Sequence, residues 1–277
     1  MKLETFFTSI ADKMRELLGT VEKIKPKNFV NKLIEIFNTG KKSAYDEFWD
    51  GYQQNGERLD YYCAFAGKGW NNTTFKPKYD IIVDGNATDS AIYLFDRSRI
   101  SGSLKQLLNN YGVKLRFQNI GRISRMQRLF YNTPDITELP VIDFSSATLS
   151  SKSDLNYLNS TISWIYSLRT VEKFIFPTDV NFAGNPTNGD SIFAHCANLS
   201  NITFEGTCRF MMNFSGSPLS ADSVKSLLDH LDTTAYNGTR TIILKAKSKT
   251  AYNNKYGDWD GRIAQLTTSG NWTFSIV

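Results

Sequence analysis

The chain has 277 residues, of which 41% are hydrophobic and 13% aromatic, and a formal net charge of +5. This composition excludes a disordered chain and can supply a sizeable core for one large domain or two small ones. The lysines and arginines are scattered, with no basic run carrying interleaved aromatics, so we expect no nucleic-acid partner. The cysteines Cys63, Cys196 and Cys208 are too few for a disulfide framework.

Residues 1–40 have the apolar spacing of two short helices, which we call the head. Their inward positions are filled by Ile10, Met14, Leu17, Phe29, Leu33 and Phe37. Helices this short are marginal alone, so they must dock on the rest of the chain, on a second copy or on another protein. We predict a role in anchoring or oligomerisation, with an ordinary packed cap as the alternative.

No apolar run of signal-peptide length opens the chain, because Glu4, Asp12 and Lys13 interrupt it. No segment reaches the roughly 20 apolar residues that span a bilayer. We therefore expect neither export by the general secretory route nor membrane insertion.

Residues 41–80 are crowded with aromatic residues separated by glycines. Such density suits a carbohydrate-binding platform. It also suits a cap over the open apolar end of a repeat array, which is the interpretation we favour. Exposed rings would be the best anchors for a partner, so we predict Trp49, Tyr52 and Trp70 as binding residues.

An apolar order recurs three times between residues 130 and 204, with spacings of three that end in a spacing of two. Such a change of period is typical of a helical turn that leads into a strand. The three copies are Phe130, Thr133, Ile136, Leu139, Val141; Ile165, Leu168, Val171, Phe174, Phe176; and Phe193, Cys196, Leu199, Ile202, Phe204. Their starts lie 35 and 28 residues apart, which favours a solenoid over the alternative of an open doubly wound sheet.

Short β-type runs alternate with helical or turn-like stretches from about Lys78 onward. We expect strands at Tyr79–Val83, Ile92–Phe95, Leu115–Phe117, Leu139–Ile142, Val171–Phe176, Asn201–Phe204, Thr241–Leu244 and Trp272–Ile276. We expect helical or turn-like stretches at Ser103–Tyr111, Ser124–Phe130, Asp154–Tyr166, Ser191–Cys196, Ser220–Leu231 and Arg262–Thr268. The clearest helix is Ser220–Leu231, because Ser220 can cap it and its leucines form one inward stripe.

Two sets of motifs resemble known protein families. Phe193–Phe204 follows the order Phe-x-x-Cys-x-x-Leu-x-x-Ile-x-Phe, which resembles the leucine-rich repeats of bacterial surface antigens of the BspA-like class. The motifs Phe48-Trp-Asp-x-Tyr52 and Asn271-Trp-Thr-Phe274, with the head, resemble tail-associated proteins of phages and prophages of low-GC gut bacteria.

The resemblance implies an α/β leucine-rich-repeat solenoid over residues 81–277, with a C-terminal closing unit, behind the helical head and the aromatic-rich cap. It implies a non-enzymatic structural or adhesion protein of a virion tail or baseplate, made in the bacterial host cytoplasm. The head would bind other tail or baseplate proteins, with a homo-oligomer left open. The solenoid would bind a host surface glycan or protein.

Residues with catalytic potential are sparse. His195 and Cys196 are adjacent in sequence, which does not bring their side chains together, and no paired spacing of zinc ligands occurs. Asp258 and Asp260 lack the remaining ligands of a calcium loop. We predict no catalytic residue, metal or cofactor. The alternatives are a bacterial cell-surface adhesin, and an envelope-polysaccharide depolymerase whose carboxylates converge from distant turns.

Cys196 is interpreted as a packing position, because Thr133 and Leu168 take its place in the other two copies.

Overall fold

The computed structural model describes residues 12–13, 65–67, 69–84, 94–120, 128–149, 161–180, 192–234 and 238–277. The chain divides into two compact units, Met1–Gln54 and Asn55–Val277. Of the first unit only the helical residues Asp12 and Lys13 are described. Several predicted residues therefore lie outside the described part, namely Ile10, Met14, Leu17, Phe29, Leu33, Phe37, Trp49 and Tyr52.

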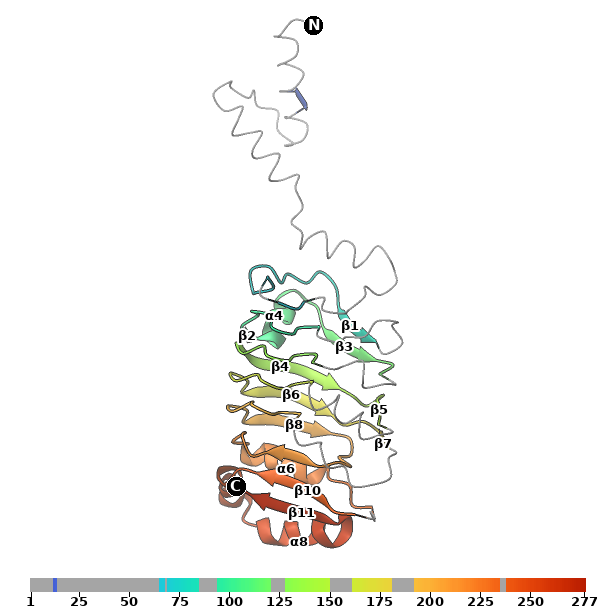
Figure 1. The fold of residues 1–277 in the computed structure, drawn as a ribbon, viewed down its shortest axis with the longest axis vertical. Coiled ribbons are helices and arrows are strands. Elements are labelled where there is room, and N and C mark those ends of the chain that lie inside the picture. The colour runs from blue at the N-terminus through green and yellow to red at the C-terminus, as the bar shows by residue number, and fades with distance from the viewer. Residues whose placement is uncertain are drawn as a thin grey trace, which may run out of the picture. The chain divides into compact units, whose positions relative to one another are not determined.

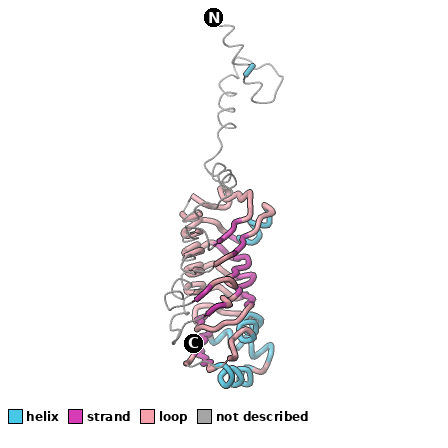
Figure 2. The backbone as a smooth tube through the Cα atoms, turned by 90° about the vertical axis from the view of Figure 1, so that its right-hand side faces the viewer, coloured by secondary structure: helices cyan, strands magenta, loops and turns pink. Residues whose placement is uncertain are grey.

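The second unit combines helices with parallel sheets. Its described strands are β1 (Ile81–Asp84), β2 (Gly102–Ser103), β3 (Leu115–Gln118), β4 (Ile136–Asp143), β5 (Thr148–Leu149), β6 (Thr170–Ile175), β7 (Asp179–Val180), β8 (Asn201–Glu205), β9 (Met212–Phe214), β10 (Arg240–Leu244) and β11 (Trp272–Ile276). The described helices are α4 (Leu104–Asn110), α6 (Ala221–Asp229), α7 (Ala246–Tyr256) and α8 (Trp259–Gly270). The strands lie one above another in chain order (Figure 1), and loops stack opposite them until α6, α7 and α8 gather near the C-terminus (Figure 2).

The larger sheets are built from successive segments of the chain. The four-stranded sheet has the order β2-β4-β6-β8 and the three-stranded sheet the order β9-β10-β11, with every pair parallel. Glu138 pairs with Thr170, and Thr170 with Asn201, which are steps of 32 and 31 residues. Arg240 pairs with Trp272, again a step of 32. This regular parallel stacking is compatible with the predicted solenoid, and the leucine-rich-repeat class stays a prediction.

Strand pairing corrects the alignment of the three apolar copies. Leu139 pairs with Val171, and Val171 with Ile202, so these three residues are equivalent. Counting back from them, the second copy begins at Ile162 rather than Ile165, and Ile165 rather than Leu168 is the equivalent of Cys196. In the first copy Ile142, which is fully buried and pairs with Phe174, replaces Val141 as the last member.

The described elements also differ in places from the expected ones. The expected strand Ile92–Phe95 is a turn where it is described, whereas the stretches expected to be helical or turn-like contain turns at residues 161–162, 166–167 and 192–195. Helix α7 was not expected. Helix α6 is confirmed: the N–H of Ser223 is bonded to the Ser220 side chain at its start, and Val224, Leu227 and Leu228 are buried.

Aromatic rings fill the interior next to the first turns. Phe65 and Phe130 lie on either side of Phe95, each with its ring centroid 5.1 Å from that of Phe95. Trp70 packs edge-on against Phe65 at 5.3 Å and is only 8% exposed. Trp70 is therefore a core residue, and the expectation that its ring is exposed for binding is corrected. The interpretation of residues 41–80 as a cap stays a prediction.

Helix α6 covers the edge of the four-stranded sheet beside β8. The backbone N–H groups of Ile202 and Phe204 donate to the hydroxyls of Ser223 and Ser226, both at 2.8 Å. The Ser223 hydroxyl donates to the carbonyl of Ser200 at 3.1 Å. An edge strand that would otherwise offer unpaired N–H groups is thereby satisfied by side chains one helical turn apart.

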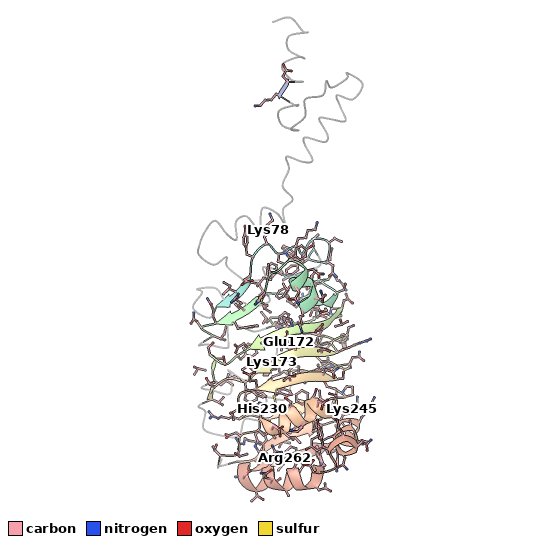
Figure 3. The ribbon with its side chains drawn as sticks, turned by 180° about the vertical axis from the view of Figure 1, so that it is seen from behind. Lys78, Glu172, Lys173, His230, Lys245 and Arg262 are labelled. Carbon is pink, nitrogen blue, oxygen red and sulfur yellow. The ribbon has the colours of Figure 1, made fainter. Side chains whose placement is uncertain are left out.

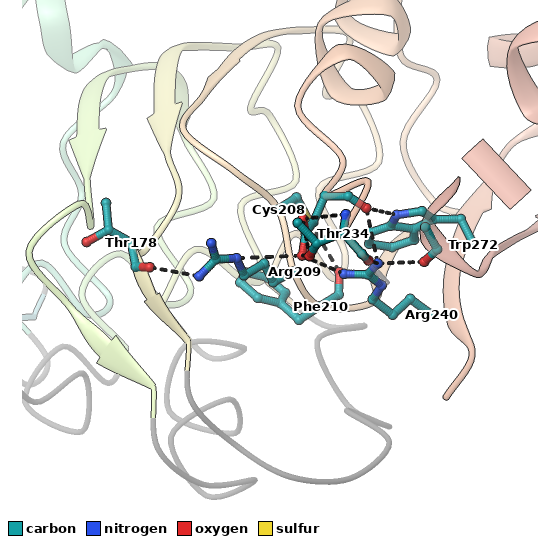
Figure 4. Close-up of polar contacts among 9 residues, drawn as sticks. Thr178, Cys208, Arg209, Phe210, Thr234, Arg240 and Trp272 are labelled. Carbon is teal, nitrogen blue, oxygen red and sulfur yellow. Dashed lines mark hydrogen bonds and ion pairs between the residues drawn. The ribbon is translucent and has the colours of Figure 1, made fainter. Parts of the chain in front are cut away.

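A buried ion pair, which we call the clasp, joins the C-terminal elements (Figure 4). Arg240 is 1% exposed, and its Nη1 donates to Asp232 Oδ2 at 3.0 Å. Its Nη2 donates to the carbonyls of Asp232 and Gly270, and its guanidinium lies 4.5 Å from the centroid of the Trp272 ring. A Cβ on Gly270 would lie 2.5 Å from the Asp232 carbonyl oxygen, so only glycine fits there.

Within the described residues, no helix combines the length and apolar character that crossing a membrane requires.

Candidate binding surface

The turns that precede β2, β4, β6 and β8 are tied together by backbone hydrogen bonds. The N–H groups of Arg97, Asn132 and Trp164 donate to the carbonyls of Tyr131, Ser163 and Ala194, at 2.8–3.2 Å. Each donor and the matching residue of the last turn, His195, has a positive φ, between 52° and 65°. We call Arg97, Asn132, Trp164 and His195 the turn stripe.

The turn stripe carries an exposed aromatic cluster. Trp164 is 37% exposed, and its ring centroid lies 3.9 Å from that of the exposed His195. Tyr166, 43% exposed, stands at 84° to the Trp164 ring with the centroids 6.1 Å apart, so the two rings form a corner. The Tyr131 ring is also near, with its centroid 6.3 Å from that of Trp164 and its plane tilted by 52°. Only four large apolar residues are exposed in the described part of the chain, and two of them meet here.

The backbone conformation makes these side chains unexpected at their positions. A left-handed φ favours Gly or Asn, and Gly67 and Asn132 occupy equivalent places with φ of 88° and 52°. For a bulky residue such as Trp164 this conformation costs on the order of 1–3 kcal/mol. Backbone hydrogen bonds between the turns hold this conformation in place. Because the conformation itself disfavours a bulky residue, the presence of Trp164 indicates a role other than stabilising the turn.

The turns around the stripe are basic, whereas the neighbouring strands are acidic. Residues 94–101, 128–135, 161–169 and 192–200 contain four arginines and two aspartates. Strands β4, β6 and β8 contain four acidic residues and one lysine. The turns therefore offer an anion a more favourable potential than the sheet does.

Among the described residues, Arg97 and Arg99 make only long contacts with carboxylates. The closest carboxylate contact of Arg97 is 3.8 Å from Asp96, and that of Arg99 is 3.7 Å from Asp135, both beyond hydrogen-bonding distance. The Arg97 side chain is 64% exposed. The Arg128 guanidinium lies 4.6 Å from the centroid of the Tyr131 ring.

Asp96 is the one described acid that is buried beside these arginines. Burial raises the pKa of its carboxyl, against the lowering effect of Arg97 and Arg128. Its Oδ1 atom is buried and has no hydrogen-bond partner among the described residues. Asp96 therefore neutralises little of the positive charge of Arg97 and Arg128, and the turns remain net positive.

A pocket separate from the turn stripe lies between α4 and strands β4 and β6. It has a volume of about 370 Å³ and is lined by Lys105, Leu108, Val113, Lys114, Pro140 and Glu172, among others. Lys105 pairs with Glu172 at 3.1 Å across it, so these charges already satisfy each other. Figure 3 shows Glu172 beside Lys173 in the middle of the stack, away from His230 and Arg262.

The cysteines and the metal-ligand residues show no reactive arrangement. Burial raises the pKa of the Cys196 and Cys208 thiols to about 12, so both are protonated at neutral pH. Cys196 is fully buried, and its Sγ donates to the Ile162 carbonyl at 3.3 Å, as a packing position requires. In the described part of the chain, no three His, Cys, Asp or Glu side chains gather as metal ligands.

The predicted binding residues and the observed cluster do not coincide. Trp70 is buried, Trp49 and Tyr52 lie outside the described residues, and the exposed rings belong to Trp164 and Tyr166. A sequence signal for these two existed: they fall between Ile162, Ile165 and Leu168, at the outward positions of a three-residue apolar repeat. The misplaced second copy hid it, because that alignment put Trp164 before the repeat.

No protein-family model, curated protein or solved structure matches this chain.

Proposed function

We propose that the chain is a non-enzymatic binding protein, in which a leucine-rich-repeat-like solenoid presents the turn stripe to a large partner. The observation that carries this proposal is the gathering of exposed Trp164, Tyr166 and His195 on neighbouring turns. The other exposed large apolar side chains in the described residues are Tyr111 and Val277, and each lies apart from this cluster in the sequence. Exposed aromatic groups on a rigid scaffold are the usual anchors of a binding surface.

We further propose that the protein belongs to a phage tail or baseplate and contacts the surface of the bacterial host. The resemblance of the head and of the motifs around Trp49 and Trp272 supports this assignment. The parallel pairing in steps of 31 and 32 residues supports an extended repeat scaffold. In this proposal the head attaches to the particle and the turn stripe faces the host.

Binding of the full-length protein to bacterial envelope fractions tests the first part. We expect the double variant Trp164→Ala/Tyr166→Ala to bind at least about tenfold more weakly than the wild type. Tyr111→Ala is the matched control, because Tyr111 is equally exposed, at 41%, but lies at the end of α4. Equal envelope binding by the double variant and the wild type, with both folded, would contradict a role for the stripe.

Deletion of residues 1–39 tests the assignment to the particle. We expect the truncated protein to keep envelope binding and to be lost from purified particles, because the anchor is gone. Full incorporation of the truncated protein would show that the head is not the anchor.

A bacterial cell-surface adhesin is the competing proposal, because the same exposed rings would serve it equally well. Cell fractionation separates the two: association with the wall of cells that produce no particles favours the adhesin.

A further inference from the structure

The cluster on the turn stripe has the size of a site for a small rigid group rather than for a protein surface. A stable protein interface buries about 800 Å² on each partner around a wide apolar centre. Here the exposed large apolar groups are two rings, Trp164 and Tyr166, at right angles and bordered by polar residues. One face of Trp164 is already covered by His195, which leaves the corner with Tyr166 as the place where a ring can rest.

The surroundings of this corner favour an anion. Arg97 lies two turns from Trp164 along the ladder, roughly 10 Å away at the spacing of paired parallel segments. It is well exposed and has no carboxylate within hydrogen-bonding distance among the described residues. A ligand of two or three linked rings would therefore reach from the corner to the guanidinium.

We propose that this surface binds an acidic saccharide, with one sugar ring packed in the corner of Trp164 and Tyr166 and a carboxylate or phosphate of a neighbouring unit paired with Arg97. The apolar face of a sugar ring matches an aromatic side chain, and a guanidinium binds carboxylate and phosphate with paired hydrogen bonds. This inference rests on the proposed function, because it names the ligand of the same surface.

A single-stranded nucleic acid also combines flat rings with anions, but the turns suit it less well. Nucleic-acid channels provide aromatic faces on which successive bases stack, within a positively charged groove. Here His195 covers one face of the Trp164 ring, so only one exposed corner remains instead of a row of aromatic faces, and Asp135 lies 3.7 Å from Arg99. Nucleic-acid binding is therefore an outcome of the test rather than the proposal.

The test uses the full-length protein and four probes: tetragalacturonate, the uncharged galactose tetrasaccharide, a galactose oligomer linked by phosphodiesters and a ten-residue oligothymidylate. Dissociation constants come from calorimetry, and the indole N–H signals in NMR spectra locate the site. We expect tetragalacturonate or the phosphodiester-linked galactose oligomer to bind at least about tenfold more tightly than the neutral saccharide and to shift the Trp164 signal. Raising the salt from roughly 50 to 300 mM should weaken the acidic probes selectively.

Three variants separate the two contacts. Arg97→Gln should remove the preference for the acidic probe, whereas Trp164→Ala/Tyr166→Ala should weaken every saccharide. Lys247→Gln, which removes an exposed charge on α7, should bind as the wild type does. The galacturonate and phosphodiester-linked galactose arms, which share the sugar ring, show which kind of acidic group is preferred.

Three results would overturn the inference: no saccharide shifts the Trp164 signal, the neutral and acidic probes bind equally, or oligothymidylate binds most tightly. Envelope binding that still depends on the stripe would then leave the proposed function standing with a different ligand. Loss of that dependence would remove both proposals.

Discussion

The four-stranded sheet and the C-terminal elements are held together in different ways. Around β4, β6 and β8, equivalent positions of successive turns hold apolar or small polar groups, and the position of Cys196 is filled by Thr133 and Ile165 in its neighbours. Around β10 and β11, one buried arginine links a carboxylate, three carbonyls and an indole ring. The first region distributes its stability over many similar contacts, whereas the second concentrates it at one point.

This difference predicts how the stability of each region responds to substitution. A stack of equivalent core positions tolerates chemically different side chains when their volume is preserved, because each contact contributes modestly to stability. A buried ion pair loses far more when one partner is removed, because the other charge is left without compensation.

The largest effect is expected at the clasp. Arg240→Ala should lower the free energy of unfolding by about 3–5 kcal/mol, because the buried Asp232 carboxylate would lose the guanidinium that is hydrogen-bonded to it and keep only the more distant Arg209 as a counter-charge. Chemical denaturation measures the change. Arg209→Ala is the control: Arg209 lies 3.6 Å from the same carboxylate but is 41% exposed, so a loss under about 1 kcal/mol is expected. Similar losses for both variants would show that burial does not set the difference.

Two buried aspartates should respond to acid in opposite directions. Burial alone would raise the pKa of Asp232, but hydrogen bonds from Thr234 and Arg240 hold it below its usual 3.8, whereas burial raises that of Asp96. The contribution of Asp232 is present above pH 3.8 and is lost as the pH falls through its lowered pKa. The penalty of charged Asp96 is present above its raised pKa and disappears below pH 3.8.

Asp232→Asn should therefore destabilise the protein at neutral pH, by about 2–3 kcal/mol, with a difference that narrows in acid. Asp96→Asn should stabilise it by up to about 1 kcal/mol, with a gain that also fades in acid. Denaturation curves between pH 3 and 7 check both variants. Shifts of the same sign at neutral pH would refute the contrast.

Cys196→Ala should cost about 1–2 kcal/mol, because it opens a small cavity in a column of buried side chains. Cys196→Thr should cost less, because Thr133 fills the equivalent place. Binding by the turn stripe should be unchanged, since the thiol faces the interior. Lost binding at an unchanged melting temperature would overturn the packing interpretation.

The smallest effect is expected on the turn stripe itself. Arg97→Gly should be more stable than Arg97→Ala by about 1 kcal/mol, because only glycine adopts the φ of 56° without strain. Thermal melting of the two variants makes the comparison. Equal stabilities would mean that the turn relaxes to an ordinary φ when the side chain is shortened.

The sequence reveals that an apolar pattern repeats more readily than it reveals the residue at which each copy begins. Ile162, Ile165, Leu168, Val171 and Phe174 are all apolar at intervals of three, so a copy moved by three residues matches as well as the true one. Hydrogen-bonded pairing of Val171 with Leu139 and Ile202 decides between them. Helix α6 was predictable because Ser220 and the buried leucines are local signals. The clasp was not, because Arg240 hydrogen-bonds Asp232 and Gly270, and Trp272 hydrogen-bonds Asp232, between stretches of sequence that carry no local signal of the contact.

Predicting the site required the same alignment of the apolar copies. Once Leu168 is recognised as the equivalent of Leu199, Trp164 and His195 become equivalent as well, and their closeness follows. The left-handed backbone at these residues has no local signal in Trp or His. It is imposed by hydrogen bonds from neighbouring turns, which no single stretch of sequence encodes.

The hydroxyls of Ser223 and Ser226 have a consequence for how such a chain can change in length. They accept hydrogen bonds from backbone N–H groups of β8, the last strand of the sheet, and these bonds do not depend on how many strands precede it. A unit of 31 or 32 residues could be duplicated or lost upstream while the same helix still closes the stack. Recombination within the gene could thus lengthen or shorten the molecule in whole turns, and each new turn would bring one more variable residue to the stripe.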